Sequence, residues 1–333
     1  MKNNMMIQKG KLAQNSVPRV GLGCMGMSEF YGKSDEYQNL AILDKAVEIG
    51  YRHFDTADMY GMGANECLLG KFIKRYSRYD LFLASKFGIK RNANGEMART
   101  VDGSTQYVRE ACEKSLDRLG VDYLDLYYVH RRDPATPIEE TIGILAELVQ
   151  EGLIREIGLS EVSVETYLQA QAIHPIAAIQ TEYSLLSLEP EDGMLQACKD
   201  HNTAFVAYSP MSRGLLSGML NLESVQKQGD TRQFMPRFNQ ENINHNLALV
   251  AQLNLLAQAK ECSLAQIALA WVLHQGEHIH IIPGTRTEKY LFDNFQSMSV
   301  FLSQDELSTL REYFHHNVAG ARYPQIAMTG INE

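Results

Sequence analysis

Four chemically complementary side chains stand at or just after the ends of short apolar runs: Asp55, Tyr60, Lys86 and His130. The segment YRHFDTADMY carries the aspartate and the tyrosine, LFLASK ends in the lysine, and YLDLYYVH ends in the histidine. A carboxylate, a phenol, an ammonium and an imidazole gathered at one rim can deliver a proton to a carbonyl oxygen. Carbonyl reduction also needs a hydride, which no side chain supplies, so a nicotinamide cofactor is expected as well.

The four side chains would divide this work. An unperturbed tyrosine has a pKa of about 10, roughly three units above neutral pH. Lys86 at about 4 Å from the phenol oxygen would favour the phenolate of Tyr60 by up to ~4 kcal/mol at an effective dielectric constant near 20. Asp55 would keep Lys86 protonated, and His130 could donate a ring N–H to the same carbonyl oxygen.

Each of these residues also has a purely structural interpretation. Asp55 and Lys86 could form an ordinary ion pair, Tyr60 could be a surface aromatic, and His130 could pair with Asp133 in HRRDP. Taken singly, the structural interpretation is favoured for every one of them. Taken together, complementary groups at three strand ends favour the catalytic interpretation.

The elements that would position these residues form a regular alternation. Short β-branched or aromatic runs alternate with longer segments of helical spacing, and the alternation predicts a closed parallel (β/α)8 barrel. We expect it to be a single domain over residues 1–333, with a long loop at about 211–245. The eight predicted strands are RVGLG near residue 20, RHFDT near 53, LFLAS near 82, YLDLYYV near 125, REIGLS near 156, AAIQTEY near 179, AFVAYS near 206 and IHIIPG near 281.

An open dinucleotide-binding sheet is the alternative fold. Gly21, Gly23 and Gly26 nearly match its G-x-G-x-x-G fingerprint. We discount this match because no helical pattern opens directly behind the glycines. Helix starts are marked elsewhere by capping patterns. They are Thr136–Pro137–Ile138–Glu139, Ser263 with Gln266, and Ser303 with Glu306, together with an amphipathic helix between Ser104 and Gly120.

Composition excludes several classes of function. A formal net charge of -9 argues against non-specific nucleic-acid binding and against docking to acidic membranes. Five cysteines occur without a C-x-x-C pair, which indicates reduced thiols. We find neither a signal-peptide pattern nor an apolar run long enough to span a bilayer, and therefore expect a cytoplasmic protein.

The same residues, in this order, resemble those of the aldo-keto reductase superfamily, in particular its bacterial and plant branches. The resemblance runs almost from end to end. It rests on GLGCMGMSEFYG, HFDTADMYG, ASKFG, DLYYVHR, EGLIREIGLSEVS, IQTEYSLL, AYSPMSRGLLSG and IIPGTRTEKYLFDN. It implies an NADPH-dependent reductase of aldehydes or ketones in which Asp55, Tyr60, Lys86 and His130 form the family's tetrad, with Tyr60 as general acid.

The resemblance also implies a set of cofactor contacts. Ser160 and Gln180 match residues that hold the carboxamide, and Tyr208 matches the aromatic stacked on the nicotinamide. The further matches are Cys24 and Met25 beside the nicotinamide, Asp55 within the tetrad, Ser209, Met211 and Arg213 along the diphosphate, and Gly284, Arg286, Tyr290, Asp293 and Asn294 at the adenosine end.

Two positions depart from the family pattern. Glu161 stands where many members have asparagine, and a carboxylate accepts hydrogen bonds but cannot donate them. Tyr290 replaces an arginine that elsewhere meets the 2'-phosphate, although Arg286 or Lys289 could compensate. NADPH is therefore expected in preference to NADH.

The remaining expectations concern the substrate. An apolar and aromatic rim would complete the pocket. Its expected members are Met27, Phe30, Tyr31 and the segment around Phe87, while Arg232, Arg237 and Phe238 of the long loop are either ligand contacts or part of a solvated excursion. The partner is then a small carbonyl compound whose identity cannot be read from the sequence, and neither can the oligomeric state.

Two other functions compete with catalysis by this tetrad. A cofactor-binding, redox-sensing regulatory subunit would share the whole site, and the intact tetrad argues against it. A metal-dependent barrel hydrolase would share the scaffold. His53, His130, His174 and His201 do not cluster by spacing, so no metal site is predicted.

Overall fold

The computed structural model describes residues 7–91, 100–325 and 331, and its centre is a sheet of eight parallel strands. The strands pair in chain order, and a parallel bridge between Val20 and Ile281 joins the first to the last. Around this bridge Gly21 N donates to Ile281 O at 2.8 Å, and Ile281 N donates to Arg19 O at 2.9 Å. The predicted (β/α)8 barrel is therefore confirmed. Its strands are β3 (Leu22–Gly23), β4 (His53–Asp55), β5 (Phe82–Phe87), β8 (Leu126–Val129), β9 (Ile157–Ser160), β10 (Ile176–Glu182), β11 (Ala204–Tyr208) and β12 (Ile279–Ile281).

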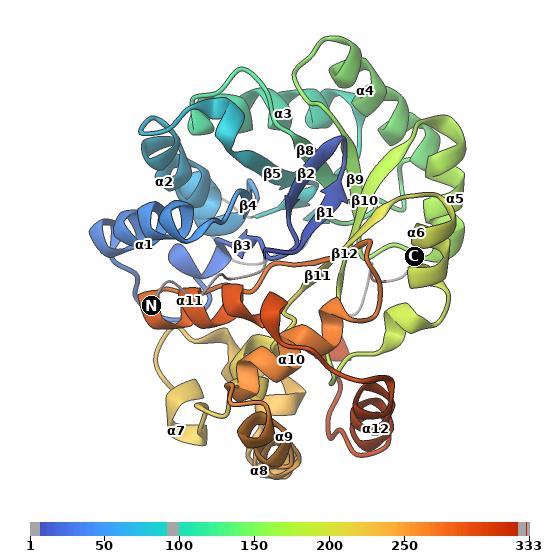
Figure 1. Cartoon of the computed structure of the whole chain (residues 1–333). Helices are drawn as coiled ribbons and strands as arrows, with labels where there is room; N and C mark the ends of the chain where they lie inside the picture. The colour runs from blue at the N-terminus through green and yellow to red at the C-terminus, as the bar shows by residue number, and fades with distance from the viewer. Residues whose placement is uncertain (1–6, 92–99, 326–330, 332–333) are drawn as a thin grey trace.

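Helices surround the strands, and their inner faces bury the outer face of the barrel (Figure 1). Because both faces of the strands are covered, nearly all of their residues are buried. A small hairpin of β6 (Ile89–Lys90) and β7 (Thr100–Val101) follows β5. The helices are α1 (Glu36–Ile49), α2 (Ala64–Ile73), α3 (Thr105–Leu119), α4 (Ile138–Gln150), α5 (Val164–Ile173), α6 (Met194–Asp200), α7 (Leu222–Val225), α8 (Gln240–Ala251), α9 (Leu253–Ala259), α10 (Leu264–Leu273), α11 (Glu288–Gln296) and α12 (Gln304–His315).

The helix starts predicted from capping patterns are largely confirmed. Ser263 and Ser303 both form complete capping boxes, and α3 lies between Ser104 and Gly120 as expected. The prediction for Thr136 was wrong, because α4 begins at Ile138 and Pro137, which has no side-chain acceptor, occupies the N-cap position. The Thr136 hydroxyl donates to Asp133 Oδ2 at 2.8 Å instead of capping the helix.

An N-terminal hairpin closes one end of the barrel. Its strands, β1 (Lys9–Leu12) and β2 (Asn15–Pro18), lie across the middle of the ring in Figure 1. Apolar side chains of the hairpin pack on Phe82 and Ala204, the first residues of β5 and β11. The hairpin therefore plugs the end at which the strands begin, and the opposite end is left for the site.

Two fully buried histidines lie near this plug. A Cβ atom at Gly21 would lie 2.6 Å from the His53 ring, and one at Gly10 would lie 2.8 Å from the His280 ring, so each glycine makes room for an imidazole. Burial lowers the pKa of both His53 and His280 to about 3. Both side chains are therefore neutral at ordinary pH.

Residues 211–245 differ from the expected long loop. They contain η5 (Ser212–Ser217), α7, η6 (Thr231–Phe234) and η7 (Pro236–Phe238), and α8 already begins at Gln240. Asparagines at 221 and 239 cap α7 and α8 with their side chains, which explains how this polar stretch folds without a hydrophobic period. Across the described residues, no helix is long and apolar enough to cross a membrane.

Candidate active site

The four predicted catalytic residues meet at the end of the barrel where the strands finish. Asp55 is the last residue of β4, Lys86 is the penultimate residue of β5, and His130 follows β8. Tyr60 opens the short helix η2 (Tyr60–Gly63) in the loop after β4. Neighbouring parallel strands bring their carboxyl ends to one rim, which is why residues far apart in sequence converge here.

Lys86 lies at the centre of this group and is fully buried. Its ammonium donates to Asp55 Oδ1, to Thr56 O at 2.8 Å and to Tyr60 Oη at 3.5 Å. Gln180 Nε2 donates to the other carboxylate oxygen of Asp55 at 2.8 Å. The lysine thus uses all three of its donors, which fixes the direction in which it faces the phenol.

Charge and burial act on these groups in opposite directions. Burial tends to lower the pKa of Lys86, but the charge of Asp55 and the hydrogen bonds to Asp55 and Tyr60 outweigh it, so its pKa lies above the usual value and the lysine stays protonated. Burial raises the pKa of Tyr60, while Lys86 lowers it without cancelling that rise. The phenol therefore holds its proton in this structure, and the expected shift toward phenolate is outweighed by desolvation.

His130 completes the group from the far side of the phenol. Its ring lies edge-on to the Tyr60 ring, with centroids 5.8 Å apart, and its backbone N donates to Phe87 O at 2.8 Å. Asp133 instead accepts from Gly103 N and Thr136 Oγ1. The structure therefore places the imidazole against Tyr60.

Apolar residues surround the phenol on the open side. Phe30 meets the Tyr60 ring edge-on with centroids 6.4 Å apart, and Met25 packs on the same cluster. Tyr31 lies under the Arg232 guanidinium, 5.2 Å from its carbon. The expected rim was wrong at Met27, which is buried in the core. In the segment around Phe87, the Phe87 side chain is in the core, whereas Ile89 packs on the cluster that contains Tyr60.

The wall expected to hold the carboxamide is built from β9 and β10. Ser160 ends β9, is buried, and lies 3.5 Å from Arg131 Nη1. Gln180, on β10, donates to Asp55 on β4. Glu161 is also buried, but its carboxylate is bound by Arg322, with Nη2 donating at 2.6 Å and Nη1 at 3.1 Å. The acidic residue that departs from the family pattern therefore has a cationic partner from the C-terminal segment.

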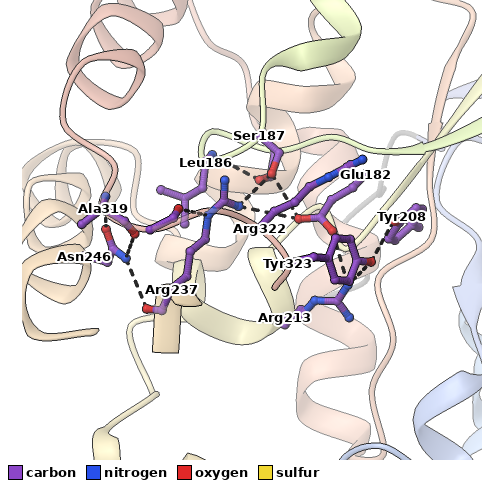
Figure 2. Close-up of polar contacts among 12 residues, drawn as sticks. Glu182, Leu186, Ser187, Tyr208, Arg213, Arg237, Asn246, Ala319, Arg322 and Tyr323 are labelled. Carbon is purple, nitrogen blue, oxygen red and sulfur yellow. Dashed lines mark hydrogen bonds and ion pairs between the residues drawn. The ribbon is translucent and has the colours of Figure 1, made fainter. Parts of the chain in front are cut away.

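Tyr208, expected to stack on the nicotinamide, ends β11 and belongs to the polar network in Figure 2. Its hydroxyl lies 3.0 Å from the hydroxyl of Tyr323. Arg213 Nη2 donates to Tyr323 Oη at 2.5 Å and to Glu182 Oε2 at 3.3 Å. The contact at the Tyr208 hydroxyl is made at the edge of the ring rather than on its face.

The segment expected to follow the diphosphate has an unusual backbone. Ser209, Ser212 and Arg213 all have positive φ angles, of 48°, 45° and 56°. Non-glycine residues adopt this region rarely, and such conformations concentrate at functional sites. Met211 precedes η5 and lies partly buried against the core.

The residues expected at the adenosine end lie on the loop after β12 and on α11. Gly284 passes so close to β3 that an added Cβ would lie 2.9 Å from Gly23 O. Arg286 donates to Tyr31 O and Lys33 O, whereas Tyr290 is partly exposed and Asp293 is half-buried. Asn294 is buried, and its Nδ2 has no hydrogen-bond partner among the described residues.

Three predicted contacts have side chains that serve the fold. The Cys24 thiol is fully buried in the core, where burial raises its pKa, so only its main chain faces the loop. Phe238 is also in the core, and Arg237 is buried against Ser187 and Gly320. Arg232 alone of the three loop candidates reaches the rim, through Tyr31.

The residues present fit a dinucleotide. Tyr208 supplies an aromatic platform at the end of β11, and Asn294 holds a buried amide donor without a partner among the described residues. Within the described parts of the chain, no group of three or more His, Cys, Asp or Glu side chains could hold a metal ion.

Sequence reasoning missed Arg322, Tyr323 and Glu182. The C-terminal pair lies beyond the last helix, in a stretch with no periodic pattern, so no local signal marks it. One indirect signal was available, because a carboxylate at 161 in a buried wall requires a cation nearby.

Comparisons with known proteins identify the family and the fold. The model of the Aldo/keto reductase family matches residues 19–314. The aldo-keto reductase yakc (NADP(+)) of Schizosaccharomyces pombe is 42% identical over 326 residues, covering 96% of this chain and 95% of that protein. The glycerol dehydrogenase of Gluconobacter oxydans superposes with a TM-score of 0.85 at 26% identity, covering 95% of this chain and 98% of that one. An aldo-keto reductase of Klebsiella pneumoniae in complex with NADPH gives 0.74 at 25% identity, covering 98% and 100%.

Proposed function

The chain belongs to the aldo/keto reductase family of oxidoreductases, and from that premise we propose that it reduces aldehydes or ketones to alcohols with NADPH, using Tyr60 as the proton donor. The observation that carries this proposal is the hydrogen bond from Lys86 Nζ to Tyr60 Oη at 3.5 Å. Because the phenol oxygen accepts from the ammonium, its own hydrogen is available to a different acceptor. A substrate carbonyl oxygen at the rim is that acceptor.

A bound NADPH supplies the hydride to the carbonyl carbon. As negative charge develops on the carbonyl oxygen, Tyr60 Oη gives it a proton, and the buried ammonium of Lys86 stabilises the phenolate left behind. Asp55 keeps that ammonium charged in a desolvated site. His130, edge-on to the phenol, is placed to donate to the same oxygen and orient it.

The cofactor assignment follows the residues on the other side of the rim. Ser160 and Gln180 would meet the carboxamide, Tyr208 would stack on the ring, and the segment from Ser209 through Met211 to Arg213 would follow the diphosphate. Gly284, Arg286, Tyr290, Asp293 and Asn294 would enclose the adenosine end, with Cys24, Met25 and Asp55 beside the nicotinamide.

We favour NADPH over NADH because two cations, Arg286 and Lys289, precede the exposed Tyr290 within four residues. The Lys289 ammonium lies 5.9 Å from the centre of the Tyr290 ring, and Arg286 donates to Tyr31 O and Lys33 O. The Klebsiella pneumoniae neighbour is described in complex with NADPH, and the yeast relative carries NADP(+) in its name. No observation on the described residues favours the redox-sensing alternative.

A carbonyl screen tests the proposal. The purified protein is mixed with NADPH or NADH and a panel of small aldehydes and ketones, while dinucleotide oxidation and alcohol formation are both measured. We expect oxidation of NADPH that depends on the carbonyl and is matched one-to-one by alcohol. Binding of NADPH without turnover on any carbonyl would instead support the regulatory function.

A further inference from the structure

The segment Ala319–Tyr323 is fastened to the barrel by its main chain. Ala319 N donates to the buried Asn246 Oδ1 at 3.0 Å, and Asn246 Nδ2 donates to Ala319 O at 2.9 Å. Arg237 Nε donates to Gly320 O at 3.3 Å. These bonds hold an irregular stretch between α8 and the rim, as Figure 2 shows.

Arg322 anchors the same segment to the carboxamide wall. Its guanidinium binds both carboxylate oxygens of Glu161, and both side chains are buried. Arg322 and Arg131 outweigh the effect of burial and hold the pKa of Glu161 below its usual value. A bidentate, charge-assisted pair of this kind fixes orientation as well as contact.

The next residue, Tyr323, touches two assigned cofactor contacts at once. Its hydroxyl is bound to the Tyr208 hydroxyl and receives a hydrogen bond from Arg213. The Arg213 guanidinium carbon also lies 5.1 Å from the centre of the Tyr323 ring. The Tyr323 hydroxyl therefore contacts both Tyr208 and Arg213.

The charges around this hydroxyl suit an anionic ligand. The guanidinium groups of Arg131, Arg213, Arg237 and Arg322 face the buried carboxylates of Glu161 and Glu182. Within this cluster cations outnumber anions, and a buried excess of positive charge favours a ligand such as a diphosphate. A purely structural network would be expected to balance its charges.

We infer that Arg322 and Tyr323 are positioning residues of the dinucleotide site: Arg322 anchors the segment on Glu161, and the Tyr323 hydroxyl sets Tyr208 and Arg213 for the nicotinamide half of the cofactor. This inference rests on the proposed function, because that proposal assigns Tyr208 and Arg213 to the cofactor. It also gives Glu161 a role, which is to hold the segment rather than to meet the carboxamide.

The test is the variant Tyr323→Phe, titrated with two ligands. NADPH spans the whole site, whereas 2',5'-ADP carries the adenosine end with one phosphate of the diphosphate and lacks the nicotinamide half. We expect the variant to bind NADPH about tenfold more weakly, since two hydrogen bonds to one hydroxyl are lost. Its affinity for 2',5'-ADP is expected to stay within the error of the wild-type value.

Tyr76→Phe is the matched control, since it removes a hydroxyl that donates to Asp44 at 3.0 Å in the outer layer. It should change neither affinity. Equal weakening of both ligands by Tyr323→Phe, or weakening of neither, would overturn the inference. A wild-type protein that binds neither ligand would instead overturn the proposed function.

A second variant tests the anchor. Arg322→Met should weaken NADPH binding by at least as much as Tyr323→Phe, again sparing 2',5'-ADP. The double variant should bind NADPH no more than about twofold more weakly than Arg322→Met alone, because the hydroxyl can act only while the segment is anchored. Full additivity would show that the two residues act separately, and would contradict the anchoring role. If Arg322→Met does not fold, the measurement on Tyr323→Phe still decides the inference.

Discussion

At the scale of single residues, the proposed chemistry depends on the direction of one hydrogen bond. Lys86 has three N–H donors, and they go to Asp55, to Thr56 O and to Tyr60 Oη. The phenol oxygen therefore accepts, and its own hydrogen is left for an outside partner. A lysine with fewer fixed partners could turn away from the phenol. The site thus depends on the pair with Asp55 as much as on Tyr60.

The first residue-scale prediction concerns the proton donor. Tyr60→Phe keeps the ring that packs on Phe30 but removes the hydroxyl. We expect turnover to fall by about 10²–10⁴-fold, the usual contribution of a positioned acid. Binding of NADPH, followed by fluorescence titration, should be unchanged. Turnover near the wild-type rate would show that another group donates the proton.

The second residue-scale prediction concerns the buried charge. In Asp55→Asn the Lys86 ammonium loses the neighbour that raises its pKa. Unfolding in urea should become easier by about 3–5 kcal/mol, the usual cost of leaving a buried charge unpaired, and turnover should fall as well.

Glu36→Gln is the comparison variant for Asp55→Asn. It breaks an exposed pair with Lys71 at 2.7 Å and should cost about 0–1 kcal/mol. Similar decreases in the free energy of unfolding in the two variants would mean that burial does not determine how much the Asp55–Lys86 pair stabilises the fold.

At the scale of elements, predictions from the sequence succeeded where the signal is local. Ser263 and Ser303 sit three residues before their partners, so both capping boxes can be seen in a short window. The prediction for Thr136 was wrong because α4 begins one residue later than expected, which leaves Pro137 at the N-cap position. A shift of one residue in a helix start depends on backbone geometry that the sequence pattern does not contain.

The capping box at α10 gives the element-scale prediction. Ser263→Ala removes the acceptor for Gln266 N and should lower the free energy of unfolding by about 1 kcal/mol, within a usual range of about 0.5–2. Ser77→Ala is the control, because Ser77 precedes a short helix without making a capping bond. Chemical denaturation of both variants would reveal the difference. An equal loss at both positions would contradict the role of the box.

In the candidate site, too, residues marked by a local sequence pattern were predicted, and residues that depend on distant contacts were missed. Asp55, Lys86 and His130 were proposed because each stands at or next to the end of a recognisable strand. Arg322 was missed because its partner, Glu161, is 161 residues away and no pattern joins them. Met27 was assigned to the rim from its position alone, but the direction of its side chain places it in the core. Such directions are settled by packing, which a single sequence does not display.

At the scale of the whole molecule, the two ends of the barrel are built for different tasks. The end where strands finish carries the tetrad and the polar network. The other end is filled by the β1–β2 hairpin and holds the neutral histidines His53 and His280. Their imidazoles would charge only if the barrel opened. Protonation of His53 and His280 therefore affects the stability of the fold and not turnover.

An acid titration of stability tests this assignment. The pKa of His53 is lowered from 6.5 to about 3 in the folded state, so the unfolded state binds the extra proton as the pH falls below 6.5. Stability should therefore drop toward acid pH, with about 1.4 kcal/mol per pH unit due to this one group.

The variant His53→Leu should lose that share of the slope between pH 6.5 and pH 4, measured by urea unfolding at a series of pH values. Met219→Leu, a change at an exposed position without a titratable group, is the control and should keep the wild-type slope. An unchanged slope in His53→Leu would mean that the ring is not held neutral by burial.

The hairpin plug has a consequence for laboratory evolution. Because the closed floor of the cylinder is separate from its mouth, a mutant library can be confined to the loop residues around Phe30 and Tyr31 without touching the floor. Such a library would sample new substrate preferences, and its members would keep the hairpin's contribution to the free energy of unfolding. If the hairpin were randomised instead, most variants would misfold, and substrate selectivity would not change.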